Sequence, residues 1–133
     1  MKTSDSIILL IFGLAFWFAG TIYYRFRGAM ILETTSSRFW INFVAVPVLC
    51  AIVCIAVLRA RQIPGAAWAS AALLIALPGL FGEAVVLSDF AKFMPRLQAS
   101  SGAKYGAFLF AAYALFLAAA EVVTLRAAYT PQQ

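Results

Sequence analysis

Residues 39–58 read FWINFVAVPVLCAIVCIAVL and contain no charged side chain. About 20 apolar residues at 1.5 Å each are needed for a helix that crosses the hydrocarbon core of a bilayer. Lipid offers no hydrogen bonds to the backbone, so a segment that spans it has to be helical or part of a closed barrel. This stretch therefore predicts a membrane-spanning helix, and it decides the class of fold.

Three other stretches of the chain have the same length and character, and none shows the period-2 alternation that a membrane barrel requires. These spans cover residues 7–24, 66–87 and 105–123. The sequence thus predicts an all-α integral membrane four-helix bundle that forms a single domain over residues 1–133. One side, the tail side, holds both termini and a short turn. The other, the loop side, holds two longer loops.

The composition supports lipid as the surrounding solvent. Hydrophobic residues make up 65% of the chain and charged residues 11%, against about 45–50% and about 25% in soluble domains. This excludes a soluble monomer, and the bilayer becomes the first expected partner. The net charge of +5 indicates loops lying against anionic headgroups and no nucleic-acid partner. The chain has no histidine, so we expect no metal and no cofactor.

The second long loop carries an amphipathic pattern. Phe90, Phe93, Met94 and Leu97 recur at helical spacing, which predicts a short helix in the headgroup plane over residues 89–97. Pro95 should weaken its last turn because proline removes a backbone donor.

Glu83 is the most informative side chain, because an ionisable group inside a span is costly and often functional. It lies about one turn inside the third span from the loop side. We expect a polar cluster around it, with Arg25 or Arg27 as its ion-pair partner. The other polar residues at this depth are Thr21, Tyr24, Asn42 and Tyr105. The cluster is either a structural ion pair or a proton- or cation-linked site.

Two prolines and several glycines bear on the packing of the helices. Pro47 and Pro78 lie at nearly the same depth, and each is expected to kink its helix, which could open a vestibule on the loop side. Gly13 with Gly20, and Gly79 with Gly82, offer flat surfaces for close helix approach. Such surfaces do not distinguish contacts within one chain from contacts between copies.

Several short motifs resemble one uncharacterised bacterial family of four-span inner-membrane proteins, a domain of unknown function. They are Phe12–Thr21 (FGLAFWFAGT), Phe39–Asn42 (FWIN), Ala76–Gly79 (ALPG) with an acidic residue at 83, Phe93–Pro95 (FMP), and Tyr105–Ala107 (YGA) leading to Tyr113. The resemblance implies a four-span fold and a multi-pass location in the bacterial cytoplasmic (inner) membrane, and it implies no activity. The family pattern more often has aspartate where this chain has Glu83.

The leading hypothesis for function is a small non-enzymatic membrane protein with an accessory or structural role. Such a protein would associate with itself or with a larger membrane complex. The alternative is a small dimeric transporter or channel that uses Glu83 as its intramembrane carboxylate. A membrane enzyme is disfavoured, since the sequence shows no pairing of a nucleophile with a base.

Overall fold

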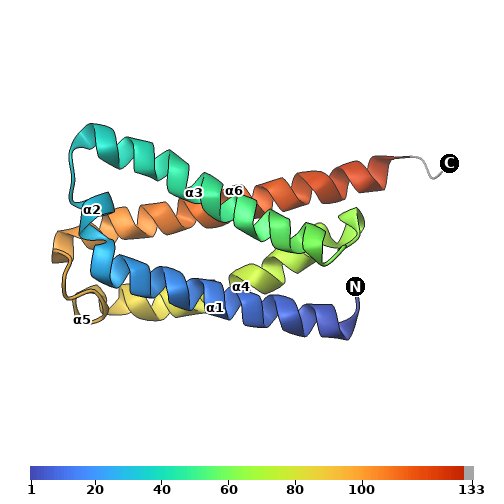
Figure 1. Cartoon of the computed structure of the whole chain (residues 1–133), viewed down its shortest axis with the longest axis horizontal. Helices are drawn as coiled ribbons and strands as arrows, with labels where there is room; N and C mark the ends of the chain where they lie inside the picture. The colour runs from blue at the N-terminus through green and yellow to red at the C-terminus, as the bar shows by residue number, and fades with distance from the viewer. Residues whose placement is uncertain (131–133) are drawn as a thin grey trace.

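Four long helices run side by side along the molecule (Figure 1). They are α1 (Thr3–Arg27), α3 (Ser36–Ala60), α4 (Trp68–Ser88) and α6 (Gly102–Tyr129). The computed structural model describes residues 1–130, and every regular element in that range is helical. By length and composition, each long helix is able to cross a membrane. The predicted all-α four-helix bundle is confirmed, with the make-up of a multi-pass membrane protein.

Helices α1, α3 and α6 extend beyond the predicted spans at both ends, because helical hydrogen bonding continues into the flanking residues, whereas α4 begins at Trp68, two residues after the predicted start. The fourth helix, for example, ends at Tyr129 instead of near Val123. Pro47 and Pro78 both lie inside their helices, which remain helical on either side. Each proline lacks the N–H that would reach the carbonyl four residues earlier, on Phe43 and Leu74 respectively.

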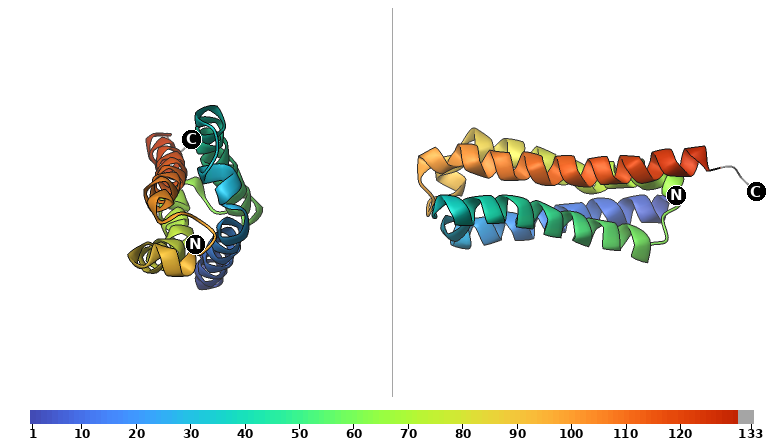
Figure 2. Two further views of the ribbon diagram at one scale, coloured as in Figure 1. Left: turned by 90° about the vertical axis from the view of Figure 1, so that its left-hand side faces the viewer. Right: turned by 90° about the horizontal axis from the view of Figure 1, so that it is seen from above.

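The helices pack in the order α1, α4, α6, α3, which is not their order along the chain. Two layers result, one of α1 and α3 and the other of α4 and α6 (Figure 2). The closest approach is between α1 and α4, where a Cβ atom on Gly13 would overlap the backbone carbonyl of Ile75. By contrast, α1 and α3 lie in the same layer and hardly touch.

At the tail side, the start of α4 is fixed against the end of α6. The Trp68 indole N–H donates to the carbonyl of Ile63 at 2.9 Å, which closes the turn that leads into α4. The hydroxyl of Thr124 on α6 accepts from the backbone N–H of Ala69 at 2.9 Å. The second of these bonds satisfies a backbone donor in the first turn of α4 that has no partner within the helix.

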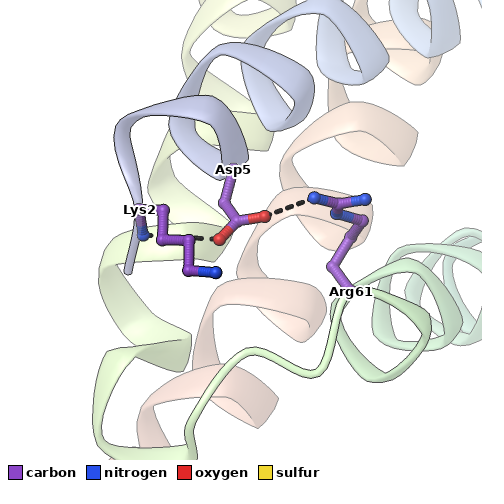
Figure 3. A network of polar contacts seen from close by, with 3 residues as sticks. All are labelled: Lys2, Asp5 and Arg61. Carbon is purple, nitrogen blue, oxygen red and sulfur yellow. Dashed lines mark hydrogen bonds and ion pairs between the residues drawn. The ribbon is translucent and has the colours of Figure 1, made fainter.

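An ion pair also joins the tail-side ends of the α1/α3 layer (Figure 3). Oδ1 of Asp5 lies 2.5 Å from Nη2 of Arg61, the residue that follows α3. The backbone N–H of Lys2 donates to Oδ2 of the same carboxylate at 3.3 Å. A carboxylate in the first turn of a helix also interacts favourably with the helix dipole. The sequence alone does not reveal this pair, whose members lie 56 positions apart.

At the loop side, the two long connections fold onto the bundle. They contain the short helices α2 (Ala29–Leu32) and α5 (Phe90–Phe93) and the 3₁₀ turn η2 (Ala99–Ser101). The carboxylate of Glu33 joins the two connections, because it accepts from the Gln98 backbone N–H at 2.5 Å and from the Ser101 hydroxyl at 2.8 Å. Apolar side chains of both connections are buried together, and we call them the loop-side cap: Ile31, Leu32, Phe90, Met94 and Leu97.

The amphipathic segment of the second loop differs from the prediction. Helix α5 ends at Phe93, well short of residue 97. Met94 adopts φ −122° and ψ 62°, because the ring of a following proline disfavours the α conformation. Met94 is fully buried and Leu97 nearly so, so these apolar side chains pack on the protein and not on lipid.

Candidate functional site

Glu83 lies in the interior of the bundle, with 6% of its surface exposed. It is on α4, five residues before the loop-side end of that helix at Ser88. The hydroxyl of Tyr105, from the start of α6, lies 2.9 Å from Oε2 and 3.1 Å from Oε1 of the carboxylate. Tyr105 is itself fully buried, and its ring meets the Tyr24 ring edge-on at a centroid distance of 5.2 Å. Three helices therefore hold the carboxylate and its donor.

Glu83 borders a cavity of about 100 Å³ that all four long helices line. We call this the interior cavity. Its wall is mainly apolar and rich in aromatic rings, with the Glu83 carboxylate as its acidic group. The aromatic residues that line it are Phe16, Trp17, Tyr24, Tyr105, Phe108, Tyr113 and Phe116.

Two glycines on α4 allow aromatic side chains to reach the wall of the interior cavity. A Cβ atom on Gly82 would overlap the indole ring of Trp17, and a Cβ atom on Gly79 would overlap the hydroxyl of Tyr113. Glycine is therefore required at both positions for this arrangement of rings. The expected flat surface at Gly79 and Gly82 exists, and it receives side chains rather than a helix backbone.

Two polar atoms in the wall have no hydrogen-bond partner among residues 1–130. They are the indole nitrogen of Trp17 and the hydroxyl of Thr21, and both are buried. A buried polar group is normally hydrogen-bonded, so an unpaired one calls for an explanation. Both residues line the interior cavity, where the Trp17 indole lies near Glu83 and the Thr21 hydroxyl near Tyr105.

The structure brings together only part of the predicted polar cluster. Tyr105, Thr21 and Tyr24 line the interior cavity with Glu83, whereas Arg25, Arg27 and Asn42 lie outside its wall. Within residues 1–130, the predicted ion pair between Glu83 and an arginine is not formed. The ion pair in this part of the chain joins Asp5 and Arg61.

The geometry of α1 explains why the arginines do not reach Glu83. Each residue along a helix is rotated by about 100° from the one before it. Tyr24 faces the interior, so Arg25 is turned away from it and is only half-buried. Arg27 is exposed, and its Nη1 lies 3.6 Å from the sulfur of Met30. Glu83 is thus left without a positive partner from α1.

Trp17 and Tyr113 line the interior cavity and were not among the predicted site residues. One signal was available for Trp17, because Trp17, Thr21 and Tyr24 follow helical spacing and share one face of α1. No comparable signal marks Tyr113, whose position depends on Gly79 of another helix.

The arrangement is suited to holding a small cation. A carboxylate attracts positive charge strongly where water is scarce, and aromatic faces attract cations through their quadrupoles. Cys50 and Cys54 of α3 also line the interior cavity as free thiols. Within residues 1–130, no three His, Cys, Asp or Glu side chains gather in a way that could hold a metal ion.

Comparison with known proteins gives a family and adds no activity. Neither the curated proteins nor the solved structures contain a match to the chain. Residues 31–127, which include α3, α4 and most of α6, match a family described as a family of unknown function (DUF5367). Glu83, Tyr105 and Tyr113 all fall within the matched region. The chain belongs to the DUF5367 family of unknown function.

Proposed function

We propose that this protein is a membrane carrier for small organic cations, with Glu83 as the group that binds the positive charge. The observation that carries the proposal is the burial of the Glu83 carboxylate in an aromatic-lined cavity without a basic partner among residues 1–130. An ionised carboxylate that is buried away from water carries a desolvation cost unless it is paired. A bound cation would offset part of that cost.

The size of the interior cavity limits the cargo. An engineered protein cavity of about 150 Å³ binds benzene, and the interior cavity measures about 100 Å³. It therefore suits a compact cation such as tetramethylammonium, or the ammonium end of a larger molecule. The aromatic wall supports this choice, because aromatic cages recognise quaternary ammonium groups.

The packing above and below the cavity favours a carrier over a channel. On the tail side, Leu9, Leu58 and Trp68 belong to one buried apolar cluster. On the loop side, the loop-side cap covers the end of the bundle. A channel would need a continuous path through both. A carrier needs an enclosed site that opens to one side at a time.

A purely accessory role accounts less well for Glu83. A protein that only supports others gains nothing from a buried carboxylate without a positive partner, since a neutral side chain would pack there at lower cost. We also propose that the protein is not an enzyme. Self-association and docking onto a larger membrane complex stay predictions. The interior cavity does not depend on either, because its lining residues all come from one chain.

The proposal predicts that Glu83→Gln abolishes cation transport. Purified protein would be placed in liposomes with a potential that is negative inside, and uptake of radiolabelled tetramethylammonium would be followed. The wild type should accumulate the cation, and the variant should fall to the level of protein-free liposomes, because glutamine keeps the shape but removes the charge. Glu121→Gln is the matched control, since Glu121 is exposed on α6 and its loss should leave uptake intact. Wild-type uptake by Glu83→Gln, or no uptake by the wild type, would contradict the proposal.

A further inference from the structure

The layer of α1 and α3 leaves one side of the interior cavity without helix packing. These two helices hardly touch along their length, whereas the other neighbouring pairs, α1 with α4, α4 with α6, and α6 with α3, pack closely. Figure 1 views the bundle from this side, with α1 and α3 apart in front. We call the line between them the α1/α3 seam.

Cavity residues from both helices of the α1/α3 seam are only partly covered. Gly20 of α1 and Val46 and Cys50 of α3 line the interior cavity and are half-buried. A Cβ atom on Gly20 would meet no heavy atom within 4 Å, so space is open at this residue. Unlike Gly13, Gly20 makes no close helix contact, and the open space at its Cβ position adjoins the interior cavity that it lines.

Glu83 lies close to the loop-side end of its helix. Five residues separate it from the end of α4 at Ser88, which corresponds to about 7–8 Å along the helix axis. A charged head at the loop-side surface therefore has about one and a half helical turns to descend before it reaches Glu83.

Taken with the proposed function, on which this step rests, the geometry points to a single-chain alkylammonium amphiphile as the cargo. It enters sideways from the loop-side leaflet through the α1/α3 seam. Its ammonium head binds at Glu83 among the aromatic rings, and its alkyl tail leaves the cavity over Gly20 and stays in lipid. The head alone has to fit the cavity of about 100 Å³, and the loop-side cap does not have to open.

Competition between two cations that share one head tests this inference. Unlabelled tetramethylammonium and decyltrimethylammonium would each compete with the uptake of radiolabelled tetramethylammonium. The quantity compared between variants is a ratio, the half-inhibitory concentration of tetramethylammonium divided by that of decyltrimethylammonium. In the wild type, decyltrimethylammonium should compete better by about a hundredfold or more, because membrane partition concentrates it at the seam. Decyl sulfate, with the same tail and the opposite charge, should not compete.

The decisive variant is Gly20→Leu, which fills the open space at the seam. It should reduce the wild-type ratio by about tenfold or more, because a tail can no longer leave the cavity there. Ala19→Leu is the matched control, since Ala19 is exposed on the neighbouring position of α1 and should keep the ratio. Should Gly20→Leu fail to fold, Gly20→Ala should lower the ratio in the same direction by a smaller factor.

Failure of this inference is distinct from failure of the proposed function. If Glu83 is required for tetramethylammonium uptake but Gly20→Leu and Gly20→Ala leave the ratio unchanged, entry through the seam is overturned and the carrier stands. The same holds if decyltrimethylammonium competes no better than tetramethylammonium, or if decyl sulfate competes equally well. If the wild type takes up no tetramethylammonium, the proposed function itself is overturned.

Discussion

Replacing Gly13 with alanine is expected to destabilise the bundle by about 3 kcal/mol, at the upper end of the range for overpacked sites. The added methyl group would overlap the backbone carbonyl of Ile75, and a backbone atom inside a helix cannot turn aside as a side chain does. Helix α1 must then move away from α4, its main partner in the bundle. The free energy of unfolding, measured by reversible unfolding in mixed micelles, would report the loss.

Gly20→Ala is the matched control for this prediction, because it makes the same change on the same helix in open space. Alanine is intrinsically favoured over glycine in a helix by about 1 kcal/mol, so the control should be neutral or slightly more stable. Equal stability of the Gly13→Ala and Gly20→Ala variants would show that α1 does not pack on α4 as described.

The second large effect is expected from Tyr105→Phe. This change removes the hydroxyl that donates to both carboxylate oxygens of Glu83. A buried group left without its partner costs about 1–3 kcal/mol, and more when it is charged. The phenylalanine ring keeps the packing against Tyr24 and Phe90, so the loss of stability in the same unfolding measurement is attributable to the hydrogen bond.

A double-mutant cycle tests that attribution. When both partners of a buried hydrogen bond are replaced by apolar groups, the net effect on stability is small. Adding Glu83→Leu to Tyr105→Phe should therefore recover most of the lost stability. Additive losses in the two single variants and the double variant would mean that the two side chains do not interact.

The four spans were readable from the sequence because bilayer thickness sets their length. Residues 39–58 lack any charge, and no other environment explains a stretch of that length and composition as well. Glu83 stood out for the same reason, since one acidic residue within an apolar span is rare. Its nearness to Tyr105 followed from depth alone, because both lie about one turn inside the loop-side boundary.

The side-by-side arrangement of the helices could not be predicted in the same way. In a soluble helix the apolar face marks the interior, but in lipid the outer face is apolar too. Helix α1 is apolar around most of its circumference, so nothing in the sequence showed that Tyr24 faces inward and Arg25 does not. The pairing of Asp5 with Arg61 joins residues that are 56 positions apart and likewise depends on which helices are neighbours.

The packing of the second loop was predicted wrongly, because the sequence does not show which surface its apolar side chains contact. An amphipathic segment outside the spans is expected to use lipid as its apolar surface. Here Ile31 and Leu32 of the other loop supply that surface, and Met94 and Leu97 pack against it. Only the effect of Pro95 on the end of the short helix could be anticipated from local chemistry.

Direct binding of tetramethylammonium to purified protein is the sharpest test of the central claim, that Glu83 holds a cation inside the bundle. Scintillation proximity would measure saturable binding to the wild type, Glu83→Gln and Glu121→Gln without any requirement for transport. We expect saturable binding to the wild type and to Glu121→Gln, and its loss in Glu83→Gln. Saturable binding that survives in Glu83→Gln with unchanged affinity would show that Glu83 does not hold the cation.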